Sequence, residues 1–271
     1  MGGQGDDSGI TPRGGRFTIR ALRAAVLPTP GWALEFGAND ATLHDLHFYV
    51  WLVTDGETVG LIDTGLPLDR ADADALGATN AAFGDPVGFR DVRTLPEILA
   101  DAGVRPEDVS FVAITQTVTY HTGGLDAELL PNAIFYLARA GVWELLADPP
   151  GHPAPEFYFT RSSWASLRDL AVGGRLRLVA DCAQIVPGVR FVVTGGHHPG
   201  SAAVVVDTAT GVVGILETAF VKRNLESGTP IGIAEDMAAA RRAMSSMRDR
   251  CDTVVAIHDP DNARDFPGAT R

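Results

Sequence analysis

Polar residues directly follow apolar, strand-like segments at five places in this chain of 271 residues. These places are residues 63–65 (DTG), 116–121 (QTVTYH) and 195–200 (GGHHPG), with Glu217 and His258. Side chains that follow different strands often meet at one rim of a sheet, where catalytic and metal sites are commonly built. A lone histidine after a strand is more often a surface residue than a ligand, but five such places favour a site. We therefore expect sheets that bring these residues together.

The strands themselves are short and closely spaced. The Asp55-Gly56 pair between residues 47–53 and 57–63 is typical of a β-hairpin. Further strands are expected over residues 16–28, 111–115, 134–138, 175–181, 188–196, 202–208, 212–217 and 252–258.

Two helices have clear patterns, over residues 95–104 and 234–250. Residues 66–92 have no clear pattern. Residues 148–165 combine four prolines with several aromatic residues and are expected to form an irregular loop or cap. Strands and helices alternate in two halves, which predicts an α/β fold of two mixed sheets with helices outside.

The N-terminal residues and the net charge bear on the expected location and partners. The Gly-rich residues 1–15 are expected to be a disordered tail before one domain over 16–271. There is no export signal, so we expect the cytoplasm. The net charge of −12 argues against nucleic acid or a membrane surface as partner. A small-molecule substrate is expected, and the sequence leaves the oligomeric state open.

The segment ITQTVTYHTGG, residues 114–124, has the shape of a metal-binding loop. An apolar strand precedes it and two glycines close it. His121 is its one good metal ligand. Gln116, Val118 and Tyr120 stand where a binuclear site would have two histidines and an aspartate.

Longer segments around this loop resemble a known family. They are HFYVWLVTDGETVGLIDTG, LPEILADAGVRPEDVSFVAIT, GGHHPGSAAVVVDTATG and VVAIHDPDNARDFP, and they follow one another in the family's order over about residues 45–268. The family is the metallo-β-lactamase fold superfamily, and within it the branch of N-acyl-homoserine-lactone lactonase-like proteins. The resemblance implies a four-layer αββα sandwich.

The same resemblance shows a degenerate metal-binding loop. The family reads His-x-His-x-Asp-His where this chain reads QTVTYH. Gln116 and Val118 thus replace two histidines of the first metal, and Tyr120 replaces the aspartate of the second.

Four other residues match family ligands. They are His121, His197, His258 and Glu217, the last standing where the family has a bridging aspartate. His198 stands where the family has threonine and is not assigned as a ligand.

Counting these ligands predicts at most one metal ion. His197 alone remains at the first position. His121, His258 and Glu217 remain at the second, and two histidines with one carboxylate suit a catalytic zinc or a non-haem iron, zinc being preferred here. Tyr120, His197 and Glu217 are the candidate catalytic groups. Tyr120 is the candidate proton donor, because a phenol with a pKa near 10 carries its proton at neutral pH.

Other residues are expected beside the ligands. Asp63 and Gln116 are placed next to them, with Asp63 orienting the loop through hydrogen bonds. Phe157 and Tyr158 are candidate substrate contacts, and ordinary packing in a cap explains them equally well.

Three functions follow from this count. The first is a metal-dependent hydrolase of a lactone, ester or thioester, in which a metal-bound water attacks the carbonyl carbon. The second is a metal-free member, either a binding protein or an acid/base enzyme. The third is a mononuclear iron oxygenase that uses His121, His258 and Glu217.

Overall fold

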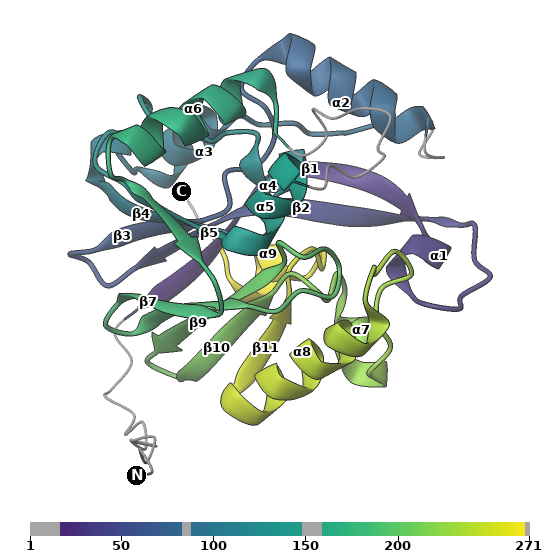
Figure 1. The fold of residues 1–271 in the computed structure, drawn as a ribbon. Helices are drawn as coiled ribbons and strands as arrows, with labels where there is room; N and C mark the ends of the chain where they lie inside the picture. The colour runs from purple at the N-terminus through teal and green to yellow at the C-terminus, as the bar shows by residue number, and fades with distance from the viewer. Residues whose placement is uncertain (1–16, 83–87, 148–158, 269–271) are drawn as a thin grey trace.

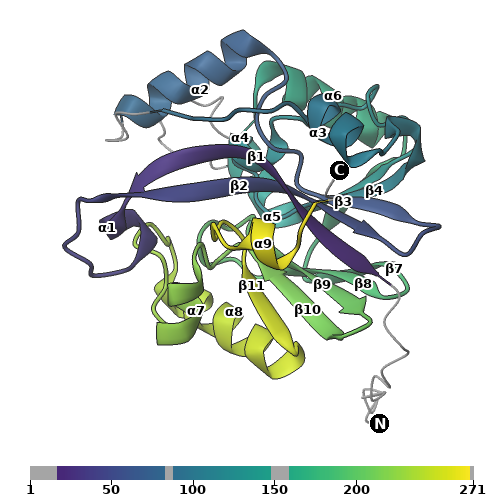
Figure 2. The same ribbon diagram turned by 180° about the vertical axis from the view of Figure 1, so that it is seen from behind.

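The computed structural model describes residues 17–82, 88–147 and 159–268. In these ranges two β-sheets pack face to face with helices on their outer sides (Figures 1 and 2). The predicted tail over residues 1–15 lies outside them, so the division into a tail and one domain stays a prediction.

The first sheet has six strands in the order β1-β2-β3-β4-β5-β6. The hairpin predicted at Asp55-Gly56 is present, with β2 and β3 antiparallel, whereas β3 to β6 run parallel. The strands are β1 (Thr18–Pro30), β2 (Leu43–Thr54), β3 (Val59–Ile62), β4 (Val109–Ile114), β5 (Ile134–Ala138) and β6 (Leu176–Val179).

The second sheet has five strands in the order β11-β10-β9-β8-β7. Adjacent strands in this sheet are antiparallel except β10 and β11, which run parallel. The strands are β7 (Cys182–Val186), β8 (Val189–Val193), β9 (Ala202–Thr208), β10 (Gly211–Leu216) and β11 (Thr253–Ala256). Both sheets are therefore mixed, as predicted.

Helices cover the outer faces of both sheets. In Figure 1, α2 (Arg70–Ala82), α3 (Leu95–Ala102) and α6 (Arg161–Val172) lie over the first sheet, and α7 (Lys222–Ser227) and α8 (Met237–Arg250) over the second. The shorter elements are α1 (Gly31–Leu34), α4 (Thr119–Thr122), α5 (Arg139–Ala147), α9 (Asn262–Asp265) and a 3₁₀ turn (Pro106–Asp108). Across the described ranges, no helix has the length and apolar character that a membrane span requires.

Three apolar clusters separate the four layers. The cluster containing Trp51, Phe111 and Phe191 fills the space between the sheets. A second, with Leu99, joins the six-stranded sheet to its helices, and a third, with Met247, joins the five-stranded sheet to α8. Burial of these apolar faces is the main driving force for such layering. The predicted αββα sandwich is confirmed.

Several elements differ from the sequence prediction. Residues 66–92 contain α2, and α6 begins at Arg161. The expectation of an irregular segment up to residue 165 is therefore wrong at its end, because the Thr160 hydroxyl accepts a hydrogen bond from Ser163 N and caps a helix there. Strand β7 was not predicted, and α8 begins at Met237 instead of Ala234, after the N-cap Asp236.

Candidate functional site

The carboxyl ends of two pairs of parallel strands carry the candidate residues. Asp63 directly follows β3, and the loop that contains His121 follows β4. Glu217 directly follows β10, and His258 lies two residues after β11. His197 comes from the loop between β8 and β9. None of the five is more than 7% exposed, so the group is an interior one.

Asp63 holds the first half of this group. Its carboxylate accepts hydrogen bonds from Thr115 N at 2.7 Å and from the Thr115 hydroxyl, and it contacts His121 Nδ1 at 2.8 Å. Asp63 has a φ of 63°, a left-handed conformation that aspartate tolerates better than most residues. Because Nδ1 is used by the carboxylate, Nε2 is the nitrogen of His121 left for a ligand or a proton.

Two glycines let the loop approach the Asp63 turn. A Cβ on Gly123 would lie 2.3 Å from Pro67 N, and one on Gly124 would lie 2.4 Å from Thr64 O. Thr64 in turn donates from its N–H and its hydroxyl to His121 O, at 2.9 and 2.8 Å. The glycines therefore fix the distance between Asp63 and His121.

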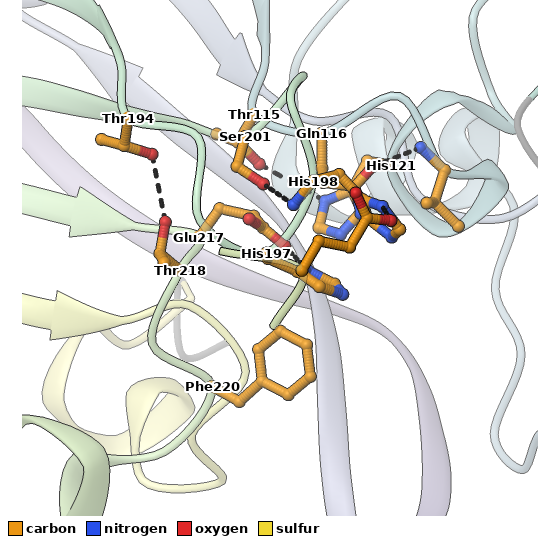
Figure 3. A network of polar contacts seen from close by, with 12 residues as sticks. Thr115, Gln116, His121, Thr194, His197, His198, Ser201, Glu217, Thr218 and Phe220 are labelled. Carbon is orange, nitrogen blue, oxygen red and sulfur yellow. Dashed lines mark hydrogen bonds and ion pairs between the residues drawn. The ribbon is translucent and has the colours of Figure 1, made fainter. Parts of the chain in front are cut away.

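Glu217 and His197 form the second half. The distance from His197 Nδ1 to Glu217 Oε1 is 2.5 Å (Figure 3). Glu217 is fully buried, and its Oε2 makes no hydrogen bond of good geometry within the described residues. A buried carboxylate oxygen without a partner is costly, so this atom is available to a ligand.

His258 completes the group from the last strand. Its Nδ1 donates to His47 O at 3.1 Å, which again leaves Nε2 free of that bond. The ring centroids of His121 and His258 are 5.2 Å apart. Phe48 packs on His258 at 4.4 Å, and Phe220 lies edge-on to it at 5.1 Å. These aromatic rings confine His258 within an apolar surround.

Ala202 joins the two halves through the backbone. Its N–H donates to Thr115 O at 2.8 Å, and its carbonyl accepts from Glu217 N at 3.3 Å. The loop after β4 and the loop after β10 are thus bonded to the same residue at the start of β9.

Burial and neighbouring charges set the protonation of these groups. Burial lowers the pKa of His121, but the Asp63 carboxylate outweighs it and the pKa is raised overall. Burial, and next the positive His121, lower the pKa of His258 well below its usual range. Burial likewise lowers the pKa of His197, despite Glu217. Burial alone would raise the pKa of Glu217, but His197 and His121 together lower it to about 2.

Three residues of the loop after β4 make contacts within the protein. Gln116 Oε1 accepts a hydrogen bond from Val118 N at 2.6 Å, and the Val118 side chain is buried in the apolar core. The Tyr120 ring packs between Phe48 and Phe89, at 5.1 and 5.7 Å. The candidate substrate contacts Phe157 and Tyr158 lie outside the described residues.

Sequence reasoning missed four residues that adjoin the group. Phe48 and Phe220 contact its histidines, and His198 and Glu235 lie beside His197. His198 was set aside because it replaces a threonine. Its position next to His197 was the one signal available, since nothing in the sequence links Glu235 or the two phenylalanines to the site.

We compared the sequence and the fold with those of known proteins. No protein-family profile matches the chain. An N-acyl homoserine lactonase of a Bacillus species is 22% identical over 192 residues, which are 69% of this chain and 70% of that protein. The structure of an N-acyl homoserine lactone hydrolase, with N-hexanoyl-L-homoserine at its catalytic metal centre, aligns with a TM-score of 0.73 and 17% identity, over 93% of this chain and 96% of the other. AidC, a dizinc quorum-quenching lactonase, aligns with a TM-score of 0.64 and 14% identity, over 94% and 90%.

The chain therefore has the metallo-β-lactamase fold. Within that fold it resembles the N-acyl-homoserine-lactone lactonase-like proteins, as its motifs predicted.

The residues present do not fit a two-metal centre. At the first position the Gln116 oxygen is bonded to its own loop and Val118 has no donor atom. His197, whose Nδ1 contacts Glu217, is the one family ligand that remains at that position. At the second position Tyr120 packs among aromatic rings.

The donors that remain are those that one ion prefers. His121 and His258 each use Nδ1 in a hydrogen bond, which is how metal-binding histidines are usually oriented. Glu217 adds Oε2, which makes no hydrogen bond of good geometry with any described residue. Among the described residues, however, no three His, Cys, Asp or Glu side chains stand ready as a metal-binding group. Binding one ion would therefore require these side chains to move.

Proposed function

We propose that the protein is a hydrolase of a lactone, ester or thioester and that it holds at most one divalent metal ion. The observation that carries the proposal is the buried group of His121, His258, His197 and Glu217 at the rim of a metallo-β-lactamase fold. Relatives of similar fold include lactone hydrolases, which supports the choice of reaction. A cytoplasmic location is part of the proposal.

The ion would be held by His121, His258 and Glu217, with zinc preferred over iron. Bound there, a divalent ion supplies a water of lowered pKa and polarises the carbonyl oxygen. His121 must lose its proton for this, and Asp63 then keeps the ring oriented through Nδ1.

His197 accepts a proton in the proposed reaction, and Tyr120 or His197 donates one. Glu217 holds Nδ1 of His197, so the neutral ring accepts the proton of the attacking water at Nε2. The new bond joins the water oxygen to the carbonyl carbon, and the bond from that carbon to the leaving oxygen or sulfur breaks. The leaving atom takes a proton from the Tyr120 phenol or from His197, which gives an acid and an alcohol or thiol.

An open surface pocket, lined in part by residues that adjoin Phe220 and His258 in the chain, is our candidate for the rest of the substrate. It has a volume of about 630 Å³, within the range of small-molecule sites. Val221 and Asp259, which line it, directly follow Phe220 and His258 in the chain. Its lining combines four apolar residues with four polar or ionisable ones: Leu34, Leu43, Val221 and Pro260, with His44, Asp45, Arg223 and Asp259.

Elemental analysis combined with hydrolysis assays tests the proposal. Protein purified without added metal, aerobically and anaerobically, should hold no more than one zinc and should open N-hexanoyl-homoserine lactone or cleave nitrophenyl esters. Two tightly held zinc ions would contradict it. One iron, or full activity after chelation, would favour the oxygenase or the metal-free member instead.

A matched pair of glutamate variants assigns the metal to this site. Glu217→Gln should lower metal content and kcat, because it removes the buried carboxylate. Glu107→Gln changes an exposed carboxylate far along the chain and should alter neither.

A further inference from the structure

His198 and Glu235 form a pair that the proposed reaction does not use. His198 Nδ1 lies 2.5 Å from Glu235 Oε1, and the His198 side chain is only 14% exposed. Its ring lies beside that of His197, with centroids 4.4 Å apart and planes inclined by 37° (Figure 3). The pair therefore touches a candidate catalytic group directly.

His197 is enclosed by three neighbours. Glu217 holds its Nδ1, the His198 ring faces it, and Phe220 contacts it edge-on at 5.0 Å with an interplanar angle of 82°. A 180° flip of the His197 ring would place Cδ2 where Nδ1 now faces Glu217 and so break that contact, and the packing against the faces of the ring decides how freely it flips. Of the two rings that contact it among the described residues, that of His198 has a charged partner, Glu235.

The backbone of this loop is fixed without the help of the pair. Glu235 N donates to His197 O at 3.1 Å, and Asp236 N donates to Gly196 O at 2.9 Å. Gly196 has a φ of +97°, and a Cβ there would lie 2.8 Å from Ala240 Cα, so the loop rests directly on α8. Loss of the contact between His198 and Glu235 should therefore leave the loop in place and release only the rings.

We propose that His198 and Glu235 are positioning residues for His197. Glu235 fixes the His198 ring, and that ring confines His197 to the orientation in which Nδ1 faces Glu217 and Nε2 is left for water. The consequence for rate rests on the proposed function, whereas the consequence for ring orientation does not.

Histidine side-chain NMR of the chelator-treated protein tests the orientation. Long-range ¹H–¹⁵N spectra of the wild type should show His197, assigned by comparison with His197→Gln, as one tautomer protonated at Nδ1. Glu235→Gln and His198→Thr should each add the second tautomer or broaden the signal by exchange. Asp101→Asn, which breaks the exposed contact with Arg93, is the matched control and should leave it sharp.

A single sharp Nδ1-protonated signal in both variants would overturn the proposal. Glu235→Gln keeps the shape of a half-exposed side chain, so this variant should fold even if His198→Thr does not. Equal melting temperatures of Glu235→Gln and wild type confirm that the spectra compare folded proteins.

Steady-state kinetics on N-hexanoyl-homoserine lactone and nitrophenyl esters test the effect on rate. Because a positioning residue acts through His197, kcat should fall about tenfold in Glu235→Gln with KM changed less than about twofold. An unchanged kcat would overturn the catalytic part. If the wild type itself turns over none of these compounds, the proposed function fails, while the spectra still decide the positioning role.

Discussion

At the scale of single residues, the length of Glu217 decides how the site is arranged. The resembling family has an aspartate here, one methylene shorter. The longer side chain reaches His197 Nδ1 at 2.5 Å with Oε1, and Oε2 makes no hydrogen bond of good geometry in the described part of the chain. One oxygen thus contacts the imidazole, and in the proposed function the other would bind the ion.

The acidity of Glu217 should appear in the pH dependence of stability. Burial raises its pKa, but His197 and His121 together lower it from 4.5 to about 2. Such a carboxyl stabilises the fold above its unfolded pKa and loses this contribution as pH falls through the folded pKa. As pH falls from about 4.5 to about 2, this group should lower the free energy of unfolding of the metal-free wild type by up to about 3 kcal/mol. Urea titrations at each pH should show a smaller loss in Glu217→Gln, and equal losses would contradict the assignment.

Tyr120→Phe separates proton donation from packing. The variant keeps the ring against Phe48 and Phe89 and removes only the hydroxyl. If the phenol donates a proton, kcat should fall by about 100-fold or more while the free energy of unfolding changes by less than about 1 kcal/mol. A kcat equal to that of the wild type would show that Tyr120 only packs.

The sequence could indicate which residues reach the rim, but not what each one contacts there. His121, His197, Glu217 and His258 are found because their motifs follow strands. That Gln116 bonds to its own loop depends on its rotamer. Rotamers are set by neighbours distant in sequence, so a local pattern carries no information about them.

At the scale of elements, local signals explain which helices were predicted. Helix α3 has a capping box between Thr94 and Glu97 and a left-handed Gly103 after its end, so local sequence signals predict both of its ends. Helix α2 has Leu76 as its one buried apolar side chain among those described, and so has no apolar stripe to recognise.

The glycine pair of the His121 loop should be intolerant of a methyl group. Gly124→Ala would place Cβ 2.4 Å from Thr64 O, so the Asp63 turn must shift, and we expect a loss of about 1–3 kcal/mol in the free energy of unfolding. Gly77→Ala in α2 meets nothing within 4 Å and should stabilise by up to about 1 kcal/mol. Chemical denaturation of both variants measures this, and a neutral Gly124→Ala would show that the two loops are not in tight contact.

At the scale of the whole molecule, three apolar layers make the fold predictable. Strand alternation and the apolar face of α8 indicate which surfaces must be buried, and two sheets with outer helices bury all of them. The order of the motifs, taken with the family resemblance, then predicted the sandwich. Strand β7 was missed, and α8 begins later than predicted, after the N-cap Asp236.

Restoring the family's ligands tests whether the scaffold has kept its shape. The triple variant Gln116→His, Val118→His and Tyr120→Asp should hold more zinc after dialysis than the wild type, as measured by elemental analysis. A triple alanine variant at the same positions controls for disruption of the loop. If the histidine and aspartate variant binds no additional metal, the backbone of the rim has diverged as well as its side chains.

The bonds of Ala202 bear on how such a protein can evolve. Its N–H and carbonyl join the loop after β4 to the loop after β10, and both bonds use main-chain atoms alone. A substitution at the ligand positions removes neither bond. The alignment of the two loops thereby depends on main-chain atoms and not on the ligand side chains, so the exchange of one ligand leaves both bonds available.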